Sequence, residues 1–135
     1  MFRFPQSVLF RHCDPAGIVF YPRYFEMMND CVEAFFASVV KWPFQAIHGQ
    51  GAVPTAEIRT RFSAPSRLGD ELTLALNVTR IGRTSCGLTI EANCGGEPRF
   101  STELTLVNVN AEGRPEVWPA DAKEQIRQFQ EYQGS

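Results

Sequence analysis

One carboxylate stands where it could do chemistry, in a tight turn just before a predicted helix. Asp14 opens the sequence Asp14-Pro15-Ala16-Gly17, which favours a type I turn because Pro fixes the second position and Gly suits the fourth. Three apolar residues, 18–20, lead to Tyr21 and Pro22, and a proline is well suited to the first turn of a helix. Two interpretations stay open for Asp14, a turn former or helix cap and a reactive carboxylate.

A thiol beside an imidazole is the second candidate for chemistry. Cys13 follows His12, and a cysteine paired with a histidine base is a common nucleophile. Neighbours in an extended segment point in opposite directions, so this pair is poorly placed. His48 lies in a glycine-containing loop and is assigned no role. The four cysteines form no Cys-x-x-Cys pair, which disfavours zinc and redox motifs, and we expect no metal site.

Composition limits the classes of protein that this chain can be. Its 135 residues fit one domain, 1–135, and the net charge of -2 gives no general attraction to nucleic acid or to an anionic membrane. No run of about 18 apolar residues is present, so we expect neither a membrane span nor a signal peptide. A cytoplasmic protein with reduced thiols is the default expectation.

The elements that would position Asp14 can be read from hydrophobic periodicity. Residues 2–10 alternate as a half-buried strand, with Phe2, Phe4, Val8 and Phe10 on one face. Residues 22 to about 40 repeat apolar side chains at helical spacing, and Trp42-Pro43 ends the pattern. At about 1.5 Å per residue this helix is long enough to cross a whole sheet.

The remaining pattern is mostly strand. Alternating segments at 56–63, 72–79, 86–92 and 100–109 are separated by turn sequences, and residues 119–132 predict a short C-terminal helix. These spacings favour antiparallel connections. We therefore predict an α+β domain in which one antiparallel sheet of about five strands wraps one long amphipathic helix, with a core of about 2–110.

Residues 13–24 resemble a known family, the hotdog-fold thioesterases of the 4-hydroxybenzoyl-CoA thioesterase-like branch. The segment Asp14-Pro-Ala-Gly17-Ile-Val-Phe-Tyr-Pro-Arg-Tyr24 is close to the family signature of an acid, a glycine, two apolar residues, two aromatic residues and a tyrosine. The order of elements agrees with the family to about residue 110. The resemblance therefore implies the hotdog fold and an acyl-CoA thioesterase.

The resemblance also assigns roles to individual residues. Asp14 matches the family's catalytic carboxylate, which attacks the thioester or activates water, and the backbone N–H of Tyr21 matches the donor to the thioester carbonyl. Gly17 belongs to the same motif and sets the spacing between the two. Unpaired N–H groups at the positive end of a helix dipole agree with that role, because they stabilise a developing oxyanion.

Substrate contacts are implied with less detail. The turn between the strands at 72–79 and 86–92 is similar to the region that contacts CoA phosphates, which makes the candidates Arg80, Arg83, Thr84 and Ser85. Phe20 and Asn29 are candidates for the acyl pocket. As we align it, the 4-hydroxybenzoyl enzyme has an acid at the position of Asn29, so the amide argues against that acyl group.

The resulting prediction is hydrolysis of an aryl-CoA or a short- to medium-chain acyl-CoA, with no cofactor beyond the CoA of the substrate. The alternatives are a non-catalytic acyl-CoA-binding protein and an acyl-thioester hydratase, although neither histidine lies in a hydratase-like motif. The family resemblance implies a homodimer or homotetramer with active sites between subunits. An exposed edge strand would agree with such pairing.

Overall fold

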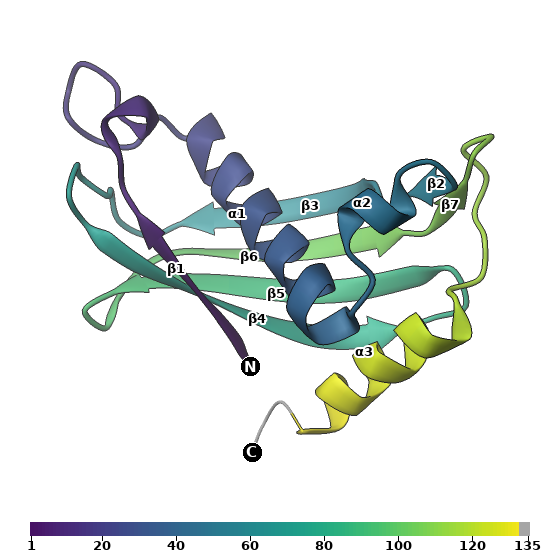
Figure 1. Cartoon of the computed structure of the whole chain (residues 1–135). Helices are drawn as coiled ribbons and strands as arrows, with labels where there is room; N and C mark the ends of the chain where they lie inside the picture. Colours follow the sequence, from purple (N-terminus) through teal and green to yellow (C-terminus); the bar gives the residue numbers. More distant parts are fainter. Residues whose placement is uncertain (133–135) are drawn as a thin grey trace.

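Five antiparallel strands form one curved sheet around a long helix in the computed structural model, which describes residues 1–132 (Figure 1). The strands occur in the order β1-β4-β5-β6-β3. Their bounds are β1 (Phe2–Ser7), β3 (Thr55–Phe62), β4 (Glu71–Ile81), β5 (Ser85–Cys94) and β6 (Glu97–Val107). The helix α1 (Pro22–Phe35) lies across the inner face. The predicted hotdog arrangement is thus confirmed.

Side-chain alternation explains the three central strands. In β4, the residues Leu72, Leu74, Leu76 and Val78 are all buried, and their neighbours in the sequence are more exposed. β5 and β6 follow the same alternation over most of their length, although Gly87 and Arg99 are buried as well. The paired registers place Leu76 opposite Ile90 and Leu88 opposite Leu104. The predicted apolar faces of these strands are confirmed, because a period of two places them all on the side of α1.

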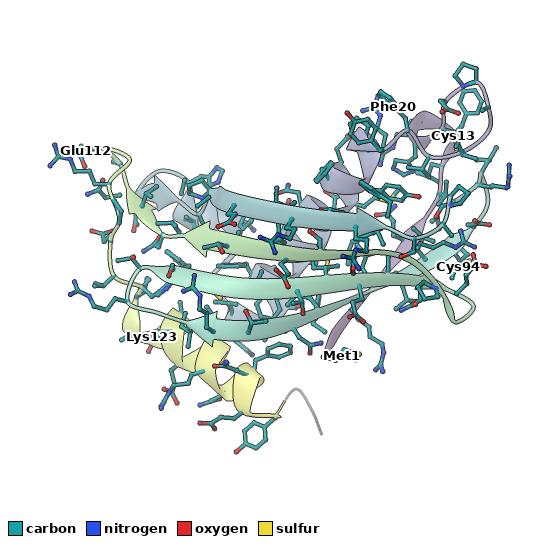
Figure 2. All side chains as sticks on the ribbon, turned by 180° about the vertical axis from the view of Figure 1, so that it is seen from behind. Met1, Cys13, Phe20, Cys94, Glu112 and Lys123 are labelled. Atoms are coloured by element: carbon teal, nitrogen blue, oxygen red, sulfur yellow. The ribbon has the colours of Figure 1, made fainter. Side chains whose placement is uncertain are left out.

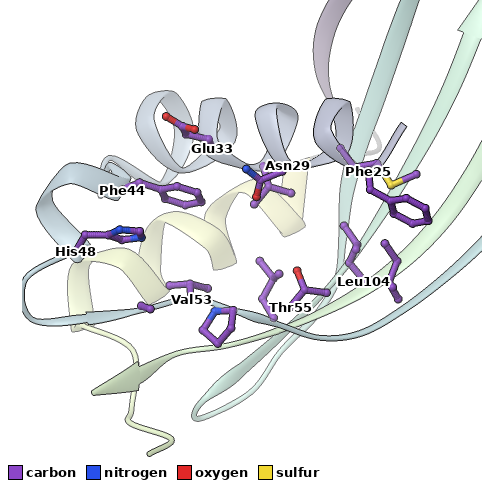
Figure 3. A pocket seen from close by; sticks show the side chains of 14 residues that line it. Phe25, Asn29, Glu33, Phe44, His48, Val53, Thr55 and Leu104 are labelled. Carbon is purple, nitrogen blue, oxygen red and sulfur yellow. The ribbon is translucent and has the colours of Figure 1, made fainter. Parts of the chain in front are cut away.

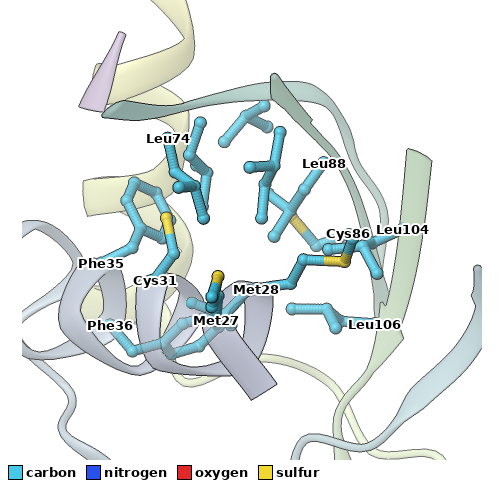
Figure 4. Close-up of a cluster of buried hydrophobic side chains, with 14 of the residues drawn as sticks. Met27, Met28, Cys31, Phe35, Phe36, Leu74, Cys86, Leu88, Leu104 and Leu106 are labelled. Atoms are coloured by element: carbon cyan, nitrogen blue, oxygen red, sulfur yellow. The ribbon is translucent and has the colours of Figure 1, made fainter. Parts of the chain in front are cut away.

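α1 buries one stripe of side chains against this sheet. Met27, Cys31 and Phe35 are completely buried, and they pack over Leu74 and Leu88 of the sheet (Figure 4). The predicted helix to about residue 40 has the correct extent, but its last turn, Phe36–Val40, is a π-helical segment. The chain then reverses at Lys41, whose φ of 60° is left-handed.

Short elements that the sequence pattern did not indicate follow this reversal. α2 (Phe44–Ile47) leads into β2 (Gly51–Ala52), which pairs with β7 (Val109–Asn110) in a separate two-stranded ribbon. They are too short to show a period of their own. They matter because α2 and the segment after β2 form one wall of a groove described below.

The first strand is shorter than predicted. β1 ends at Ser7, and a 3₁₀ turn, η1 (Phe10–His12), follows, so that Phe10 is 82% exposed instead of facing the core. The backbone leaves the sheet here because Val8 pairs with Gly69 and Asp70 in the loop before β4. The expectation of a strand continuing to residue 10 is therefore wrong.

β3 also departs from expectation, because it is the outer strand of the sheet. Its predicted apolar face includes Ile58 and Phe62, which are 40% and 45% exposed, since no strand lies beyond them. At the opposite edge, α3 (Ala120–Tyr132) covers part of β4 and buries Ala122 and Ile126, as predicted for 119–132. Within residues 1–132, no helix combines the length and apolar character that crossing a bilayer requires.

Candidate active site

The Asp14 turn is closed by its own hydrogen bonds. Gly17 N–H donates to the Asp14 carbonyl oxygen at 2.9 Å, and Ala16 N–H donates to Asp14 Oδ1, also at 2.9 Å. Gly17 has a φ of 81°, in the left-handed region that glycine adopts without strain. In the described part of the chain Asp14 Oδ2 accepts no hydrogen bond, so the half-buried carboxylate has one oxygen fixed and one available.

The loop around Asp14 is a small irregular hairpin that returns directly to the start of α1. Asp14 N–H donates to the Ile18 carbonyl oxygen at 2.9 Å, and Phe20 N–H donates to the His12 carbonyl oxygen at the same distance. Cys13 and Val19 form an isolated antiparallel bridge between these bonds. The carboxylate is therefore held at a set distance from the helix N-terminus by backbone bonds.

The N–H of Tyr21, the residue just before α1, donates no hydrogen bond within residues 1–132. Arg23 N–H donates to the Phe20 carbonyl oxygen and Tyr24 N–H to that of Tyr21, while Pro22 has no N–H. No partner for the Tyr21 N–H is found among residues 1–132. Because this donor lies at the positive end of the helix dipole, it is suited to bind a carbonyl oxygen that gains negative charge.

Aromatic side chains surround this helix end. Phe20 is 49% exposed and meets Tyr21 edge to face, with ring centroids 5.7 Å apart. Phe62, at the end of β3, contacts both Tyr21 and Tyr24, at 6.3 and 5.6 Å. The sequence pattern predicts Phe62 only as a residue of a strand. Its position at the end of an apolar alternation is the one feature of the sequence that could have indicated a place beside the helix start.

An apolar groove of about 760 Å³ runs between α1, α2 and the first half of β3 (Figure 3). Asn29, one of the two candidates for the acyl pocket, lines this groove, whereas Asp14 and Phe20 do not. His48, to which no role was assigned, also lines it, and its ring stacks on Phe44 at 5.9 Å. Nothing in the loop sequence around His48 indicated this position, because it depends on the fold of α2.

The predicted phosphate-binding turn is ordered by a side-chain contact. Arg80 Nη1 donates to Ser85 Oγ at 2.8 Å. A Cβ placed on Gly87 would come within 3.1 Å of Arg80 Cγ and 2.5 Å of Thr79 Oγ1, so the Arg80 stem lies directly over a glycine. The backbone of Arg83 and Thr84 is also fixed, because Trp118 N–H and Asn108 N–H donate to their carbonyl oxygens.

Within one chain, the Asp14 loop and the Arg80 turn lie far apart. β4 begins near the Asp14 loop, where Glu71 pairs with Ser7, and runs 11 residues to the Arg80 turn. At about 3.3 Å per residue the two lie roughly 30 Å apart along the strand. Figure 2 shows the length of the sheet, with Cys13 and Phe20 at one end and Glu112, in the loop after β7, at the other.

The alternative thiol site is not formed. His12 is buried, and its Nδ1 accepts a hydrogen bond from Leu9 N–H at 2.8 Å. The Cys13 thiol donates to the Leu9 carbonyl oxygen at 3.6 Å, and the described residues contain no hydrogen bond between it and an imidazole. His12 therefore holds the loop in place through its bond to Leu9. It is not placed to accept a proton from Cys13 or to serve as the catalytic base of a hydratase.

Comparison with known proteins gives a family and a fold. The model of the thioesterase-like superfamily matches residues 8–126. A 1,4-dihydroxy-2-naphthoyl-CoA thioesterase from Synechocystis is similar in structure, with a TM-score of 0.86, 21% identity, and coverage of 93% of this chain and 95% of the other. No curated protein matches at the significance required.

Two further solved structures contain coenzyme A. A thioesterase from Thermus thermophilus, complexed with coenzyme A and Zn, is 25% identical with a TM-score of 0.82 and coverage of 96% and 93%. A hypothetical protein from Staphylococcus aureus in complex with CoA is 19% identical, with a TM-score of 0.90 and coverage of 96% and 84%.

The environment of His12 predicts a loss of stability at acid pH. Burial, followed by the charge of Arg11, lowers the pKa of His12 below its ordinary value of 6.5. His12 therefore binds a proton more readily in the unfolded chain than in the folded one. The free energy of unfolding of the protein should be highest above pH 6.5 and fall as the pH decreases toward the folded-state pKa of His12. Urea unfolding between pH 5 and 8 measures this, with His12→Asn, which keeps an acceptor but does not titrate, expected to flatten the slope. An unchanged slope in His12→Asn, equal to that of the exposed-site control His48→Asn, would contradict the assignment.

Proposed function

The chain belongs to the thioesterase-like superfamily and is a thioester hydrolase, and we propose that it hydrolyses acyl-CoA thioesters with Asp14 as its reactive carboxylate. The observation that carries the proposal is that one short loop contains both Asp14 Oδ2 and the Tyr21 N–H, neither of which has a hydrogen-bond partner among residues 1–132. Water and the thioester would yield a free acid and the CoA thiol. No cofactor is needed beyond the CoA of the substrate.

Two chemical routes use the same geometry. Asp14 Oδ2 either attacks the thioester carbon and expels the CoA thiolate, leaving an acyl anhydride that water cleaves, or it removes a proton from an attacking water. In both routes the carbonyl oxygen gains negative charge, and the Tyr21 N–H would donate to it. A thiolate is a good leaving group, because the pKa of a thiol is about 8.5.

The acyl group would occupy the groove beside α1. Its walls are mainly apolar, with Phe25 and Met28 from the helix and Ile58 from β3, and Asn29 and His48 add polar groups. The volume of about 760 Å³ exceeds what a small acyl chain needs and suits an aryl group or a medium chain. The Synechocystis neighbour is named for an aryl-CoA substrate, which supports the same class.

A second copy of the chain would complete the site. β3 is an outer strand whose Phe62 end contacts Tyr21 and whose Thr55 end borders the groove. If β3 pairs antiparallel with β3 of a partner, the two-fold axis sets the Phe62 end of one copy beside the Thr55 end of the other. Asp14 of one subunit would then face the groove of its partner, in a dimer or a tetramer built from such dimers.

The nucleotide of CoA would be bound by the turn after β4. Arg80 donates one hydrogen bond to Ser85 and retains further N–H donors for phosphate oxygens. Arg83 is exposed at the same turn and adds a second positive charge. Because this turn is remote from Asp14 of its own chain, it would serve the active site of another subunit.

A thiol-release assay tests the activity directly. Wild-type protein should release CoA from at least one ester in a series of benzoyl, hydroxybenzoyl, phenylacetyl and straight-chain acyl-CoAs. Asp14→Asn should lower kcat by about 10²–10⁴-fold while leaving binding of the ester measurable, because only the reactive carboxylate is lost. Asp121→Asn on α3 is the matched control and should retain full activity. Near-normal turnover in Asp14→Asn would refute the role of Asp14.

Mixed oligomers test whether the site is shared. Val53→Trp should fill the groove and be inactive, and Asp14→Asn should be inactive for lack of the carboxylate. When the two variants are co-refolded, about a quarter of wild-type activity should return, because half of the dimers are mixed and each mixed dimer has one intact site. If both parts of the site belonged to the same chain, mixing would restore nothing.

Gly87 provides a test of the nucleotide site. Gly87→Ala should displace the Arg80 stem and raise KM for an acyl-CoA by roughly tenfold, the loss expected for one hydrogen bond to a charged group. kcat should change little, because the turn is remote from the reacting atoms. The same acyl group on N-acetylcysteamine has no phosphates and serves as the control, with an unchanged KM expected. An equal rise in KM for both esters would contradict phosphate binding at Arg80.

A further inference from the structure

The loop before β4, residues 64–70, holds both ends of the segment that contains Asp14. On the entry side, Val8 N–H donates to the Asp70 carbonyl oxygen at 2.9 Å, and Gly69 N–H donates to the Val8 carbonyl oxygen at 3.0 Å. On the return side, Val19 N–H donates to the Ser66 carbonyl oxygen at 2.8 Å. The position of the Asp14 turn therefore depends on the conformation of residues 64–70.

That loop is organised around one buried guanidinium. Arg99, on β6, is 9% exposed, and its Nη1 donates to Asp70 Oδ2 at 2.7 Å and to Ser66 Oγ and the Pro65 carbonyl oxygen at 3.1 Å. Its Nε lies 2.8 Å from Glu97 Oε1, an ion pair without hydrogen-bond geometry. The same Asp70 oxygen also accepts Arg67 N–H. Three points of the loop thus converge on one side-chain nitrogen.

We propose that Arg99 is a positioning residue for the reaction, acting through residues 64–70 to fix the Asp14 carboxylate relative to the Tyr21 amide. The inference rests on the proposed function of Asp14 and assigns Arg99 no contact with substrate. Arg99 donates a hydrogen bond to the Ser66 side chain, and the Ser66 carbonyl oxygen accepts one from the Val19 N–H. Val19 lies directly before Phe20, the last residue before the N-cap Tyr21 of the helix.

The hydrogen bond between Arg99 and Asp70 is stabilised by the opposite charges of the two side chains. Hydrogen bonds from Arg67 and Arg99 lower the pKa of Asp70, and the bond to Asp70 raises the pKa of Arg99. Both groups therefore remain ionised at neutral pH. A planar guanidinium also offers several donors in a fixed geometry, which a flexible ammonium does not. Since a displacement of about 1 Å can cost about 100-fold in rate, loosening this loop should affect catalysis more than binding.

The test compares Arg99→Met, which keeps the length of the stem but removes every donor, with Arg99→Lys, which keeps the charge and a donor. Arg99→Met should lower kcat by about 10–100-fold with KM changed less than about threefold, and Arg99→Lys should recover part of the loss. Ile126→Val, which removes one buried methylene from α3 far from the loop, is the control for lost stability and should retain wild-type kcat. Wild-type kcat in folded Arg99→Met would overturn the proposal.

A second readout separates this inference from the proposed function. In Arg99→Met, hydrogen exchange at the amides of Val19 and Phe20 should accelerate at least about tenfold, while the amides of β5 should keep their protection. Unchanged exchange at Val19 and Phe20 would overturn the positioning role even if turnover fell. If no thioester is hydrolysed by wild-type protein, the proposed function fails, and the exchange data still decide whether Arg99 fastens the loop. Where Arg99→Met does not fold, Arg99→Lys and Asp70→Asn give the same two measurements.

Discussion

Burial of one face of α1 in the concave side of the sheet is the interaction on which the rest of this structure depends. Met27, Cys31 and Phe35 are fully buried there, and a Met or Phe side chain contributes about 1.5–3 kcal/mol when it leaves water. Because the helix cannot rotate without exposing this stripe, its first turn is fixed in direction. The Tyr21 amide and the residues just before it are consequently held at one end of the sheet, so the position of this donor is set by packing further along the helix.

The same packing explains which parts of the fold could be predicted from the sequence. β4, β5 and α1 have one buried face each. Their Leu, Ile, Met and Phe residues therefore recur with a clear period, two residues in the strands and 3.6 in the helix. β3 has the same alternation but lies at the edge, where Ile58 and Phe62 stay partly exposed. Periodicity reports which residues are apolar, and it cannot tell an inner strand from an outer one. α2, β2 and β7 are too short to give any period.

The candidate site divides in a similar way. Asp14, Gly17 and Tyr21 form a continuous motif, and their local geometry follows from turn and helix-start chemistry that acts over a few residues. Asn29 reaches the groove because it lies on the helix, whereas His48 and Phe62 come from segments whose positions are set only by tertiary contacts. The Arg80 turn is predicted as a phosphate site from the family resemblance, yet its distance from Asp14 depends on the length and register of β4. Local motifs were therefore predictable, and their spacing across the sheet was not.

Irregular backbone around Asp14 imposes a further requirement, because such a loop lacks the continuous ladder of a sheet and must be fixed by individual bonds. Two buried polar side chains, His12 and Arg99, provide some of these bonds. His12 accepts the Leu9 amide within the loop, and Arg99 fixes the neighbouring loop that holds Val8 and Val19. Each is costly to bury. His12 is bonded by Leu9, three residues away, and Arg99 by residues 65, 66 and 70, which only the folded chain brings near. Neither belongs to an apolar period or to the Asp14 motif, so the stability of the loop and the placement of its carboxylate rest on residues that sequence patterns do not mark.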